Sequence, residues 1–294
     1  MLNVLALGAH IELRSLKKEL NELDISLDIS YFSSVRIEII NNQTQIYVAD
    51  KNICEYDFVW IKSPWNNRQF ANAITVHLDA RKIPHTEVEV ERSKLVDNVH
   101  FAEKNVNLPN TFYCVTKHML GNIEHIERVC NYPVIIKVTR GSLGEGIFLA
   151  KKRSELKHII EYKLGKAKKY ICQEFIPNDF DYRIIVSGQE KILSAEKRIR
   201  QEGEFRNNAY LGAEEIFLDA NDLSEDLKSV SLGSARALQL NWAGIDIVKS
   251  KANNEYYVLE VNRRPGLTLE SSEVRAAYTH ILSLLADRGL YLES

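Results

Sequence analysis

An acidic residue stands inside each of two neighbouring apolar segments, AGIDIV and YYVLEV, near the end of the chain. The polar stretch KSKANNE between them is typical of a hairpin connection. If Val248 pairs with Val258 across this hairpin, Asp246 lies opposite Glu260, and like charges directly opposite each other destabilise a sheet. At ~4 Å and an effective dielectric of ~20, the repulsion is on the order of 4 kcal/mol. A cation between the two acids would remove this penalty.

Asn262 follows Glu260 by two residues, so both side chains project from the same face of the strand. Two carboxylates and an amide oxygen form an all-oxygen ligand set, which suits Mg²⁺ because this ion keeps several waters and bridges to phosphates. The alternative is structural, with Asp246 and Glu260 on an exposed sheet face and paired with cations nearby. Those cations would be Arg263, Arg264 or Lys249. These residues alone leave both interpretations open.

The composition limits the classes of partner. The 294 residues carry 38 lysines and arginines against 40 aspartates and glutamates, a formal net charge of −2, so no general attraction to nucleic acid or anionic membrane is expected. The four scattered cysteines form no CxxC pair, which argues against a zinc site or disulfide framework and favours a reducing cytoplasm. No apolar run approaches the roughly 20 residues of a membrane span. We therefore expect a soluble cytoplasmic protein.

Alternating strand-like and helical patterns predict an α/β (α+β) fold with two domains. The N-terminal domain, residues 1–90, opens with a strand and a helix in a Rossmann-like arrangement and contains a hairpin at 35–48. That hairpin either holds an extended peptide by strand addition or forms a plain surface ribbon. The second domain, residues 91–294, begins with a helix from Ser93. Its apolar face is marked by Leu95, Val96, Val99 and Ala102.

Lys137 interrupts the strand PVIIKVT, where neighbouring valine and isoleucine imply burial on both faces. An unpaired ammonium there would be costly, so Lys137 is expected to meet a fixed anion. The next segment places Gly141, Gly144 and Gly146 between two strands, where backbone N–H groups can approach phosphate oxygens closely. The same glycines would also serve as plain turn formers. Because the loop joins two strands, it is neither a dinucleotide fingerprint nor a P-loop.

Five segments, taken in order, resemble the ATP-grasp superfamily and, within it, the RimK-type glutamate ligases. They are VIIKVTRGSLGEGIFL, ICQEFIPNDFDYRIIV, AEKRIRQEGEFRNN, AGIDIV and YYVLEVNRRPGL, and the likeness runs from about Ser93 to Leu290. The resemblance implies an ATP-grasp fold behind an N-terminal pre-ATP-grasp domain. A nucleotide would be held between two α+β subdomains, 91–172 with the glycine loop and 173–294 with the metal site. ATP would activate a carboxylate as an acyl phosphate that an amine then attacks.

The resemblance also implies roles for individual residues. Contacts to phosphates or adenine fall to Lys94, Lys137, Gly141, Ser142, Gly144 and Gly146. The hinge that reads adenine is matched by Glu174, Phe175 and Ile176, and the ribose-binding acid by Asp181. The magnesium ligands are matched by Asp246, Glu260 and Asn262. The positions facing the triphosphate and the acyl phosphate, where positive charge stabilises the transferring phosphoryl group, are matched by Arg198, Arg206 and Asn208.

Three arginines need separate interpretation. Arg183 either binds phosphate or is structural, and Arg200 is interpreted as a solvated residue at a basic strand end. Relatives often carry small residues where this chain has Arg263 and Arg264 in NRRPG. We interpret the bulk and charge there as selection for an acidic substrate.

Together these features predict an ATP-dependent carboxylate-amine ligase that acts on a peptide, a protein or an amino acid. Its expected cofactor is one or two Mg²⁺ ions, with Mn²⁺ as a substitute. One alternative is a ribosomal-peptide macrocyclising ligase, and another is a non-catalytic nucleotide-binding scaffold or regulator. Neither nucleic acid nor membrane is an expected partner, and the homo-oligomeric state stays open.

Overall fold

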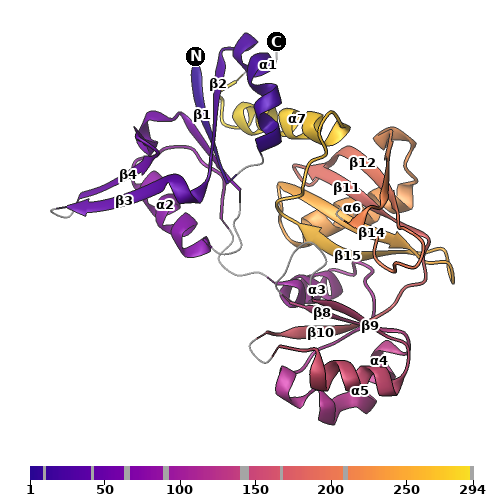
Figure 1. Ribbon diagram of the computed structural model, residues 1–294. Coiled ribbons are helices and arrows are strands. Elements are labelled where there is room, and N and C mark those ends of the chain that lie inside the picture. Colours follow the sequence, from indigo (N-terminus) through magenta and orange to yellow (C-terminus); the bar gives the residue numbers. More distant parts are fainter. Residues whose placement is uncertain are drawn as a thin grey trace. The chain divides into compact units, whose positions relative to one another are not determined.

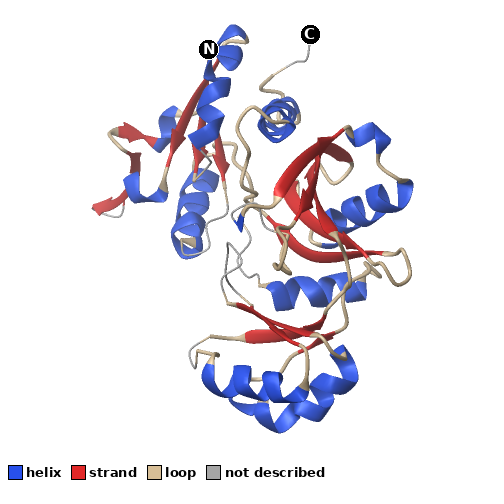
Figure 2. Ribbon diagram, turned by 45° about the vertical axis from the view of Figure 1, so that its right-hand side comes forward, coloured by secondary structure: helices blue, strands red, loops and turns tan. Residues whose placement is uncertain are grey.

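The computed structural model describes residues 1–8, 11–40, 43–62, 67–88, 93–139, 146–165, 168–207 and 211–291. The chain divides into two compact units, Met1–Glu91 with Arg263–Ser294, and Arg92–Asn262. Both units combine helices with sheets (Figure 1, Figure 2), which confirms the predicted α/β class. Within these described ranges, no helix is both long and apolar enough to cross a membrane.

The first unit contains a parallel three-stranded sheet in the order β2-β1-β6. Its strands are β1 (Leu2–Leu7), β2 (Ile25–Ser30) and β6 (Phe58–Ile61). β6 is wholly buried, as expected of a parallel strand with both faces covered. The connection from β1 to β2 is a 3₁₀ helix, η1 (Ile11–Leu16), followed by α1 (Lys17–Glu22). This is the strand and helix opening that the sequence predicts.

An antiparallel sheet in the order β3-β4-β5 also belongs to this unit. Its strands are β3 (Val35–Ile40), β4 (Gln43–Val48) and β5 (Lys51–Asn52), flanked by the 3₁₀ turns η2 (Phe32–Ser34) and η3 (Ile53–Glu55). β3 and β4 form the predicted hairpin, whose connecting residues 41–42 lie outside the described ranges. Helix α2 (Arg68–Ala80) shares one hydrophobic core with both sheets.

Helix α7 (Ser272–Ala286) belongs to the first unit. The ring of His280 lies 5.6 Å from the ring of Trp60 on β6, and Arg275 forms an ion pair with Glu19 of α1. The sequence instead placed residues 263–294 in the second domain. Periodicity reveals that a helix exists but not which sheet its apolar face covers, and this is why the compact units differ from the predicted domains after residue 262.

The second unit contains two antiparallel sheets, and the first has the order β7-β10-β8-β9. Its strands are β7 (Thr111–Phe112), β8 (Val134–Val138), β9 (Ile147–Ala150) and β10 (Tyr170–Glu174). Helices α4 (Ile123–Cys130) and α5 (Arg153–Tyr162) cover one face of it (Figure 2) and share its hydrophobic core. Two short 3₁₀ turns, η4 (Thr116–His118) and η5 (Leu120–Asn122), precede α4.

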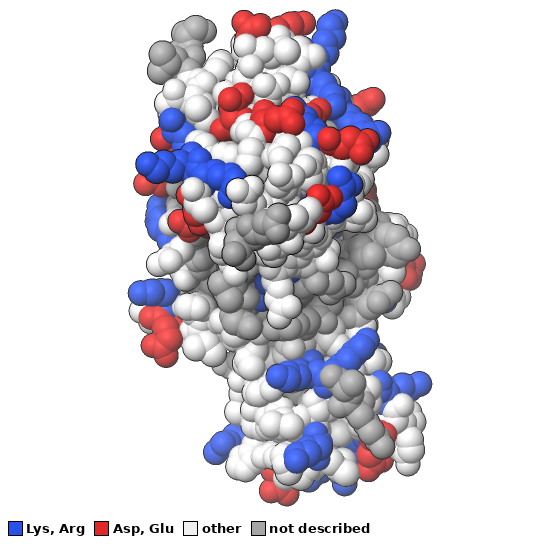
Figure 3. All heavy atoms as spheres, turned by 90° about the vertical axis from the view of Figure 1, so that its left-hand side faces the viewer, with Lys and Arg blue, Asp and Glu red and all other residues white. Residues whose placement is uncertain are grey.

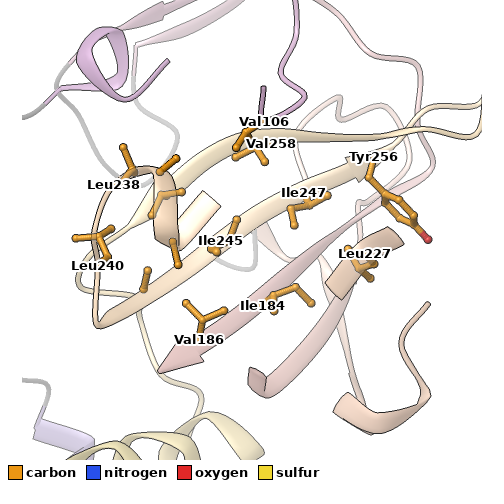
Figure 4. Packing of buried hydrophobic residues seen from close by; sticks show 14 of the residues in the cluster. Val106, Ile184, Val186, Leu227, Leu238, Leu240, Ile245, Ile247, Tyr256 and Val258 are labelled. Atoms are coloured by element: carbon orange, nitrogen blue, oxygen red, sulfur yellow. The ribbon is translucent and has the colours of Figure 1, made fainter. Parts of the chain in front are cut away.

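The other sheet of the second unit has five strands in the order β13-β12-β11-β14-β15. They are β11 (Phe180–Ser187), β12 (Lys191–Ile199), β13 (Glu214–Leu218), β14 (Trp242–Lys249) and β15 (Tyr256–Asn262). The 3₁₀ turn η7 (Ala220–Asp222) and helix α6 (Glu225–Ala237) follow β13. Figure 4 shows side chains of one sheet face, among them Ile184, Ile245 and Ile247, gathered in a core with Leu227 of α6. The sheet therefore has one face closed by apolar packing.

Helix α3 (Lys94–Glu103) begins at Ser93, whose side chain accepts a hydrogen bond from the Val96 N–H at 3.2 Å. The apolar pattern misidentifies its buried face, because Val96, Val99 and Ala102 are exposed. The buried side chains are Lys94, Asp97, Asn98 and Phe101. A largely polar buried face is expected where a helix borders a site that must hold charge.

The closed face generates a prediction about stability. Ile245 is fully buried in this core, so Ile245→Ala should lower the free energy of unfolding by about 3 kcal/mol through lost burial and the cavity left behind. Val96→Ala, on the exposed side of α3, should change it by less than about 0.5 kcal/mol. Urea unfolding followed by circular dichroism measures both, and equal effects would contradict the packing described here.

Candidate active site

The face of the five-stranded sheet opposite the α6 core is lined by charged and amide side chains from four strands. Because side chains alternate along a strand, neighbours such as Ile184, Ile245 and Val261 point to the core instead. They are Asp181 and Arg183 on β11, Glu196 and Arg198 on β12, Asp246 on β14, and Glu260 and Asn262 on β15. The sheet register brings together predicted site residues that are up to about 80 positions apart in the chain.

Across the strands, acids and bases alternate with one exception. Arg183 lies directly opposite Glu196 on one side and Asp246 on the other, and Asp181 lies opposite Arg198. Asp246 then lies opposite Glu260, so two like charges adjoin at the end of the row. This confirms the opposition of Asp246 and Glu260 inferred from the sequence.

The register that produces this opposition differs from the predicted one. Val248 pairs with Tyr257, and Val258 pairs with Ile247, so the expected pairing of Val248 with Val258 is wrong. A β-bulge causes the difference, because Leu259 is an extra residue between Val258 and Glu260 with no partner on β14. Its carbonyl instead accepts a hydrogen bond at 3.0 Å from the Lys137 ammonium.

Asp246 lies at the centre of the polar face and is enclosed by donors. Arg183 donates to both of its carboxylate oxygens, at 3.0 and 3.3 Å, and Arg198 donates to one at 3.0 Å. The Asn262 Nδ2 donates to the other at 3.0 Å. Burial by itself would raise the pKa of Asp246, but the two guanidinium groups and the hydrogen bonds lower it to about 2. Asp246 is therefore a fixed negative charge at neutral pH.

Arg198 and Asp181 form the most deeply buried ion pair of this face, with 3% and 4% of each residue exposed. Two parallel hydrogen bonds of 2.8 and 2.7 Å join the guanidinium to the carboxylate, a geometry that fixes the arginine as well as pairing it. Burial raises the pKa of Asp181 to about 6, assisted by the Asp246 charge and opposed by Arg198. Burial opposes the charge of Arg198 too, but the two carboxylates raise its pKa above the ordinary value.

Two lysines from the other part of the unit reach β15. Lys94, the first residue of α3, forms an ion pair with Glu260, and Lys137 on β8 binds the Leu259 carbonyl. Burial lowers the pKa of Lys137 to about 8, with a contribution from Lys94, while Glu260 and Asp246 oppose the shift. The negative charges near Lys137 are thus the Glu260 and Asp246 carboxylates. The group that accepts a hydrogen bond from its ammonium is the Leu259 backbone carbonyl.

The three predicted metal ligands adjoin one another. In the parts of the chain that the structure describes, no three His, Cys, Asp or Glu side chains gather as a metal-binding group, so an ion here would depend on two carboxylates and an amide. Their chemistry fits Mg²⁺, since all three supply oxygen. The structural alternative expected the two acids to pair with Arg263, Arg264 or Lys249, and the ion pairs that the structure shows are different. Arg183 and Arg198 pair with Asp246, and Lys94 pairs with Glu260.

The predicted adenine hinge begins at Glu174, the last residue of β10, and continues to Ile176. The Glu174 carboxylate accepts hydrogen bonds from the Asn110 amide at 2.8 Å and the Asn110 N–H at 3.4 Å, and the Phe175 N–H donates to the Pro133 carbonyl at 3.1 Å. The Ile176 carbonyl accepts from the Asn178 side chain at 2.7 Å. These bonds hold the hinge backbone in a defined conformation.

Gly146 is the one residue of the predicted phosphate loop within the described ranges. It has φ +69°, and a Cβ there would lie 2.9 Å from a Val138 methyl group, so both conformation and space require glycine. Gly141, Ser142 and Gly144 lie outside the described residues, and so does Asn208.

The segment after β12 contains a network that the sequence did not reveal. Arg200 donates to the Asn178 side chain at 2.9 Å, to its backbone carbonyl at 2.6 Å, and to the Asn207 side chain at 3.3 Å. Asn178 and Asn207 are both buried and also bond each other at 3.0 Å. The interpretation of Arg200 as a solvated strand end is therefore wrong. No local pattern marks this network, because its members come from two separate loops.

Arg206 lies in the same segment and is paired with an acid of that segment. Its guanidinium forms two hydrogen bonds with the Glu204 carboxylate, at 2.9 and 2.7 Å, which also accepts from the Arg206 N–H at 3.0 Å. The hydrogen bonds from Arg206 lower the pKa of Glu204 to about 2. This ion pair is local to the segment, and Arg206 precedes Asn207 of the Arg200 network.

Comparison with known sequences identifies a family and relatives. The family model described as the RimK-like ATP-grasp domain matches residues 92–282. A probable alpha-L-glutamate ligase of Shewanella loihica is 34% identical over 178 residues, which cover 60% of this chain and 56% of the relative. A protein of the same name from Vibrio vulnificus is 29% identical over 238 residues, which cover 79% of this chain and 76% of the relative. The aligned part thus spans just over half of one relative and three quarters of the other.

Solved structures share the fold at low sequence identity. The D-alanine–D-alanine ligase of Bacillus anthracis aligns with a TM-score of 0.65 at 14% identity, covering 97% of this chain and 95% of that one. The macrocyclase MdnC of Microcystis aeruginosa, bound with its precursor peptide MdnA, aligns with a TM-score of 0.60 at 15% identity, covering 94% and 99%. The ATP-grasp ligase PsnB, complexed with a minimal precursor, aligns with a TM-score of 0.66 at 15% identity, covering 97% and 98%. The predicted ATP-grasp fold is thereby confirmed.

The burial of Lys137 predicts a pH-dependent stability difference. Lys137→Met should raise the free energy of unfolding at pH 7, by up to about 3 kcal/mol, because the buried ammonium is costly. Between pH 8 and 10.5 the unfolded chain keeps this proton while the folded chain has lost it, so the wild type gains stability relative to the variant. Denaturation at pH 7 and pH 10 should show the difference closing. Lys157→Met, at an exposed position of α5, serves as the control, and a pH-independent difference for Lys137→Met would contradict the assignment.

Proposed function

We propose that this chain, which belongs to the RimK-like ATP-grasp family, is an ATP- and Mg²⁺-dependent ligase that joins a carboxylate to an amine. The observation that supports this most strongly is the adjoining pair Asp246 and Glu260, held on a polar sheet face where every other acid has a base opposite it. A sheet built for stability alone would gain by replacing one of these acids with a neutral residue. Retaining both is explained by a bound divalent cation.

Asp246, Glu260 and Asn262 would hold the magnesium ion. Asn262 donates its Nδ2 to Asp246, so its amide would have to turn about the last side-chain bond to present oxygen to a metal. Glu260 uses one carboxylate oxygen for Lys94, which leaves the other as a ligand. When bound, Mg²⁺ would offset negative charge on the phosphates.

ATP would be held by cations and backbone groups of the same unit. Lys94 and Lys137 would contact phosphates together with the glycine segment at Gly146, and the Ile176 N–H of the hinge would face adenine. Within the described residues this N–H has no acceptor, which supports a role in base recognition. Asp181 would keep Arg198 in place, because Arg198 donates one hydrogen bond to each of its carboxylate oxygens. The remaining lone pairs of these oxygens would accept hydrogen bonds from the ribose hydroxyls.

The chemistry follows from the concentration of fixed positive charge. A substrate carboxylate oxygen attacks the γ-phosphorus and the bond to ADP breaks, which gives an acyl phosphate. The amine nitrogen then attacks the acyl carbon, phosphate leaves, and the amine gives up its proton. Arg183 and Arg198 would stabilise the transferring phosphoryl group without moving, because Asp246 and Asp181 already orient them. Arg206 would release Glu204 and bind the acyl phosphate instead, and the role predicted for Asn208 stays a prediction.

For the substrates, the named relatives favour L-glutamate as the amine. Both relatives described above are called probable alpha-L-glutamate ligases, and one aligns over 79% of this chain. We therefore propose addition of glutamate to a carboxylate of a peptide or protein. Internal cyclisation of a peptide is the second candidate, and the likeness of fold to a macrocyclase supports testing it.

The first prediction concerns the metal site. Asp246→Asn should reduce Mg²⁺- and ATP-dependent ADP release at least about 100-fold, because it removes a fixed carboxylate that the ion and both arginines share. Asp222→Asn, at an exposed position of η7, should leave the rate unchanged. A coupled assay for ADP measures the rate, and circular dichroism verifies that both variants are folded. Undiminished ADP release by Asp246→Asn would refute the proposed site.

The second prediction separates the candidate reactions by product mass. With MgATP, L-glutamate and a panel of acidic peptides, the proposed ligase should yield a peptide carrying an added glutamyl residue. Hydroxylamine in place of glutamate should trap the activated carboxylate as a hydroxamate. A peptide that only loses water would identify cyclisation. ATP binding without ADP release for any pair of substrates would support the scaffold alternative instead.

A further inference from the structure

Strand β3 of the first unit has an open edge. In the described ranges it pairs only with β4, and Figure 1 shows the hairpin projecting away from the rest of its unit. The Ala49 N–H donates to the Ser34 carbonyl at 2.8 Å, which fixes the phase of the ladder. In an antiparallel pair, hydrogen-bonded residues alternate with residues whose N–H and C=O point away from the partner. The outward-pointing residues of β3 are Val35, Ile37 and Ile39.

We infer that β3 pairs with β3 of a second copy of this chain, antiparallel and centred on Ile37, to form a symmetric dimer. The sequence of the strand, Val-Arg-Ile-Glu-Ile, is complementary to itself about that centre. Ile37 would lie opposite Ile37 of the other copy, and Val35 opposite Ile39. All three outward-pointing residues would then exchange N–H and C=O bonds with outward-pointing residues of the partner. The inference does not depend on the proposed function.

The charges fit the same register. Arg36 would lie opposite Glu38 of the other copy, and Glu38 opposite Arg36, so two opposite-charge pairs flank the symmetry axis. Both side chains are accessible, with 55% and 36% of the side chain exposed. In the monomer they pair with each other along the strand at 2.7 Å, and Arg36 lies over the Tyr47 ring. The guanidinium is thus already held on the correct face of the sheet.

Other registers are disfavoured on physical grounds. A shift by two residues in one direction places Arg36 opposite Arg36, and a shift in the other direction places Glu38 opposite Glu38. A shift by one residue opposes outward-pointing groups to groups already bonded within the hairpin. The self-complementary register therefore satisfies both the hydrogen bonds and the charges.

Apolar exposure at the same edge supports association. Ile39 and Ile40 are 71% and 63% exposed, which leaves two adjacent isoleucines in water at the end of an edge strand. Pairing would cover Ile39 against Val35 of the other copy. Figure 3 views the side toward which the hairpin projects in Figure 1, and there acidic and basic side chains are interspersed rather than separated by sign.

A second copy fits the edge better than an unrelated extended peptide, because the strand itself supplies the matching charges and side chains. The interface is short, so association at roughly 10 to 100 µM is expected rather than nanomolar affinity. Sedimentation velocity of the full chain from about 1 to about 500 µM should show a reversible monomer–dimer equilibrium.

The decisive experiment exchanges the charges. Arg36→Glu alone and Glu38→Arg alone each oppose like charges twice, so each should weaken dimerisation at least about tenfold. An equimolar mixture of these two variants should form a heterodimer, since each then meets its opposite charge. The double exchange Arg36→Glu with Glu38→Arg should restore the wild-type equilibrium. Lys18→Glu, an equal change of charge at an exposed position of α1, should have no effect.

Ile39→Pro tests the backbone separately. The Ile39 N–H points to the open edge, so proline removes a bond to the second copy without breaking the ladder to β4, and the variant should be monomeric yet folded. A wild-type protein that stays monomeric up to about 500 µM would overturn the inference. It would do so even if the edge of β3 bound an added peptide. Single charge variants that dimerise as well as the wild type would overturn it equally.

Discussion

Repulsion between Asp246 and Glu260 is the interaction that the second unit is organised around. Direct opposition on neighbouring strands brings the two acids close together, and the surrounding structure supplies positive charge to them. It does so from four elements, with Arg183 on β11, Arg198 on β12, Lys94 on α3 and the nearby Lys137 on β8. Two of these elements are strands of the same sheet as the acids, whereas α3 reaches Glu260 and β8 reaches the neighbouring Leu259 carbonyl.

The bulge at Leu259 shows how local backbone geometry serves this arrangement. One extra residue shifts the register so that Glu260 faces Asp246 while Val258 still faces the core. The same residue turns a carbonyl toward Lys137, which gives a buried ammonium an acceptor near two carboxylates.

The two faces of the five-stranded sheet have different physical roles. The face against α6 is apolar and supplies burial, whereas the opposite face concentrates charge at a cost in desolvation. The burial of apolar side chains against α6 thus offsets the cost of the charged face, which would not be stable alone. Preorganised charge of this kind is what transfer of a phosphoryl group requires, since the groups need not rearrange during the reaction.

Much of this protein follows from its sequence alone. Strand and helix periodicity determined the α/β class, the hairpin of β3 and β4, and the opposition of Asp246 and Glu260, because these depend on neighbours close in the chain. Ordered motifs identified the ATP-grasp family, which the match over residues 92–282 confirms. They also predicted a ligase, which is the class that the named relatives carry. The individual roles in binding and catalysis stay predictions.

Other features were decided only by tertiary structure. The buried face of α3 holds Lys94 and Asp97 rather than Val96 and Val99, because the helix packs toward charge and not toward an apolar core. Arg200 is held by Asn178 and Asn207, which are distant in sequence and meet only when two loops fold together. The partners of Asp246 and Glu260 likewise come from other strands and from α3. A sequence fixes the period of a segment and the chemistry of its side chains, whereas long-range packing determines which side chains share a buried space and which charge each one meets.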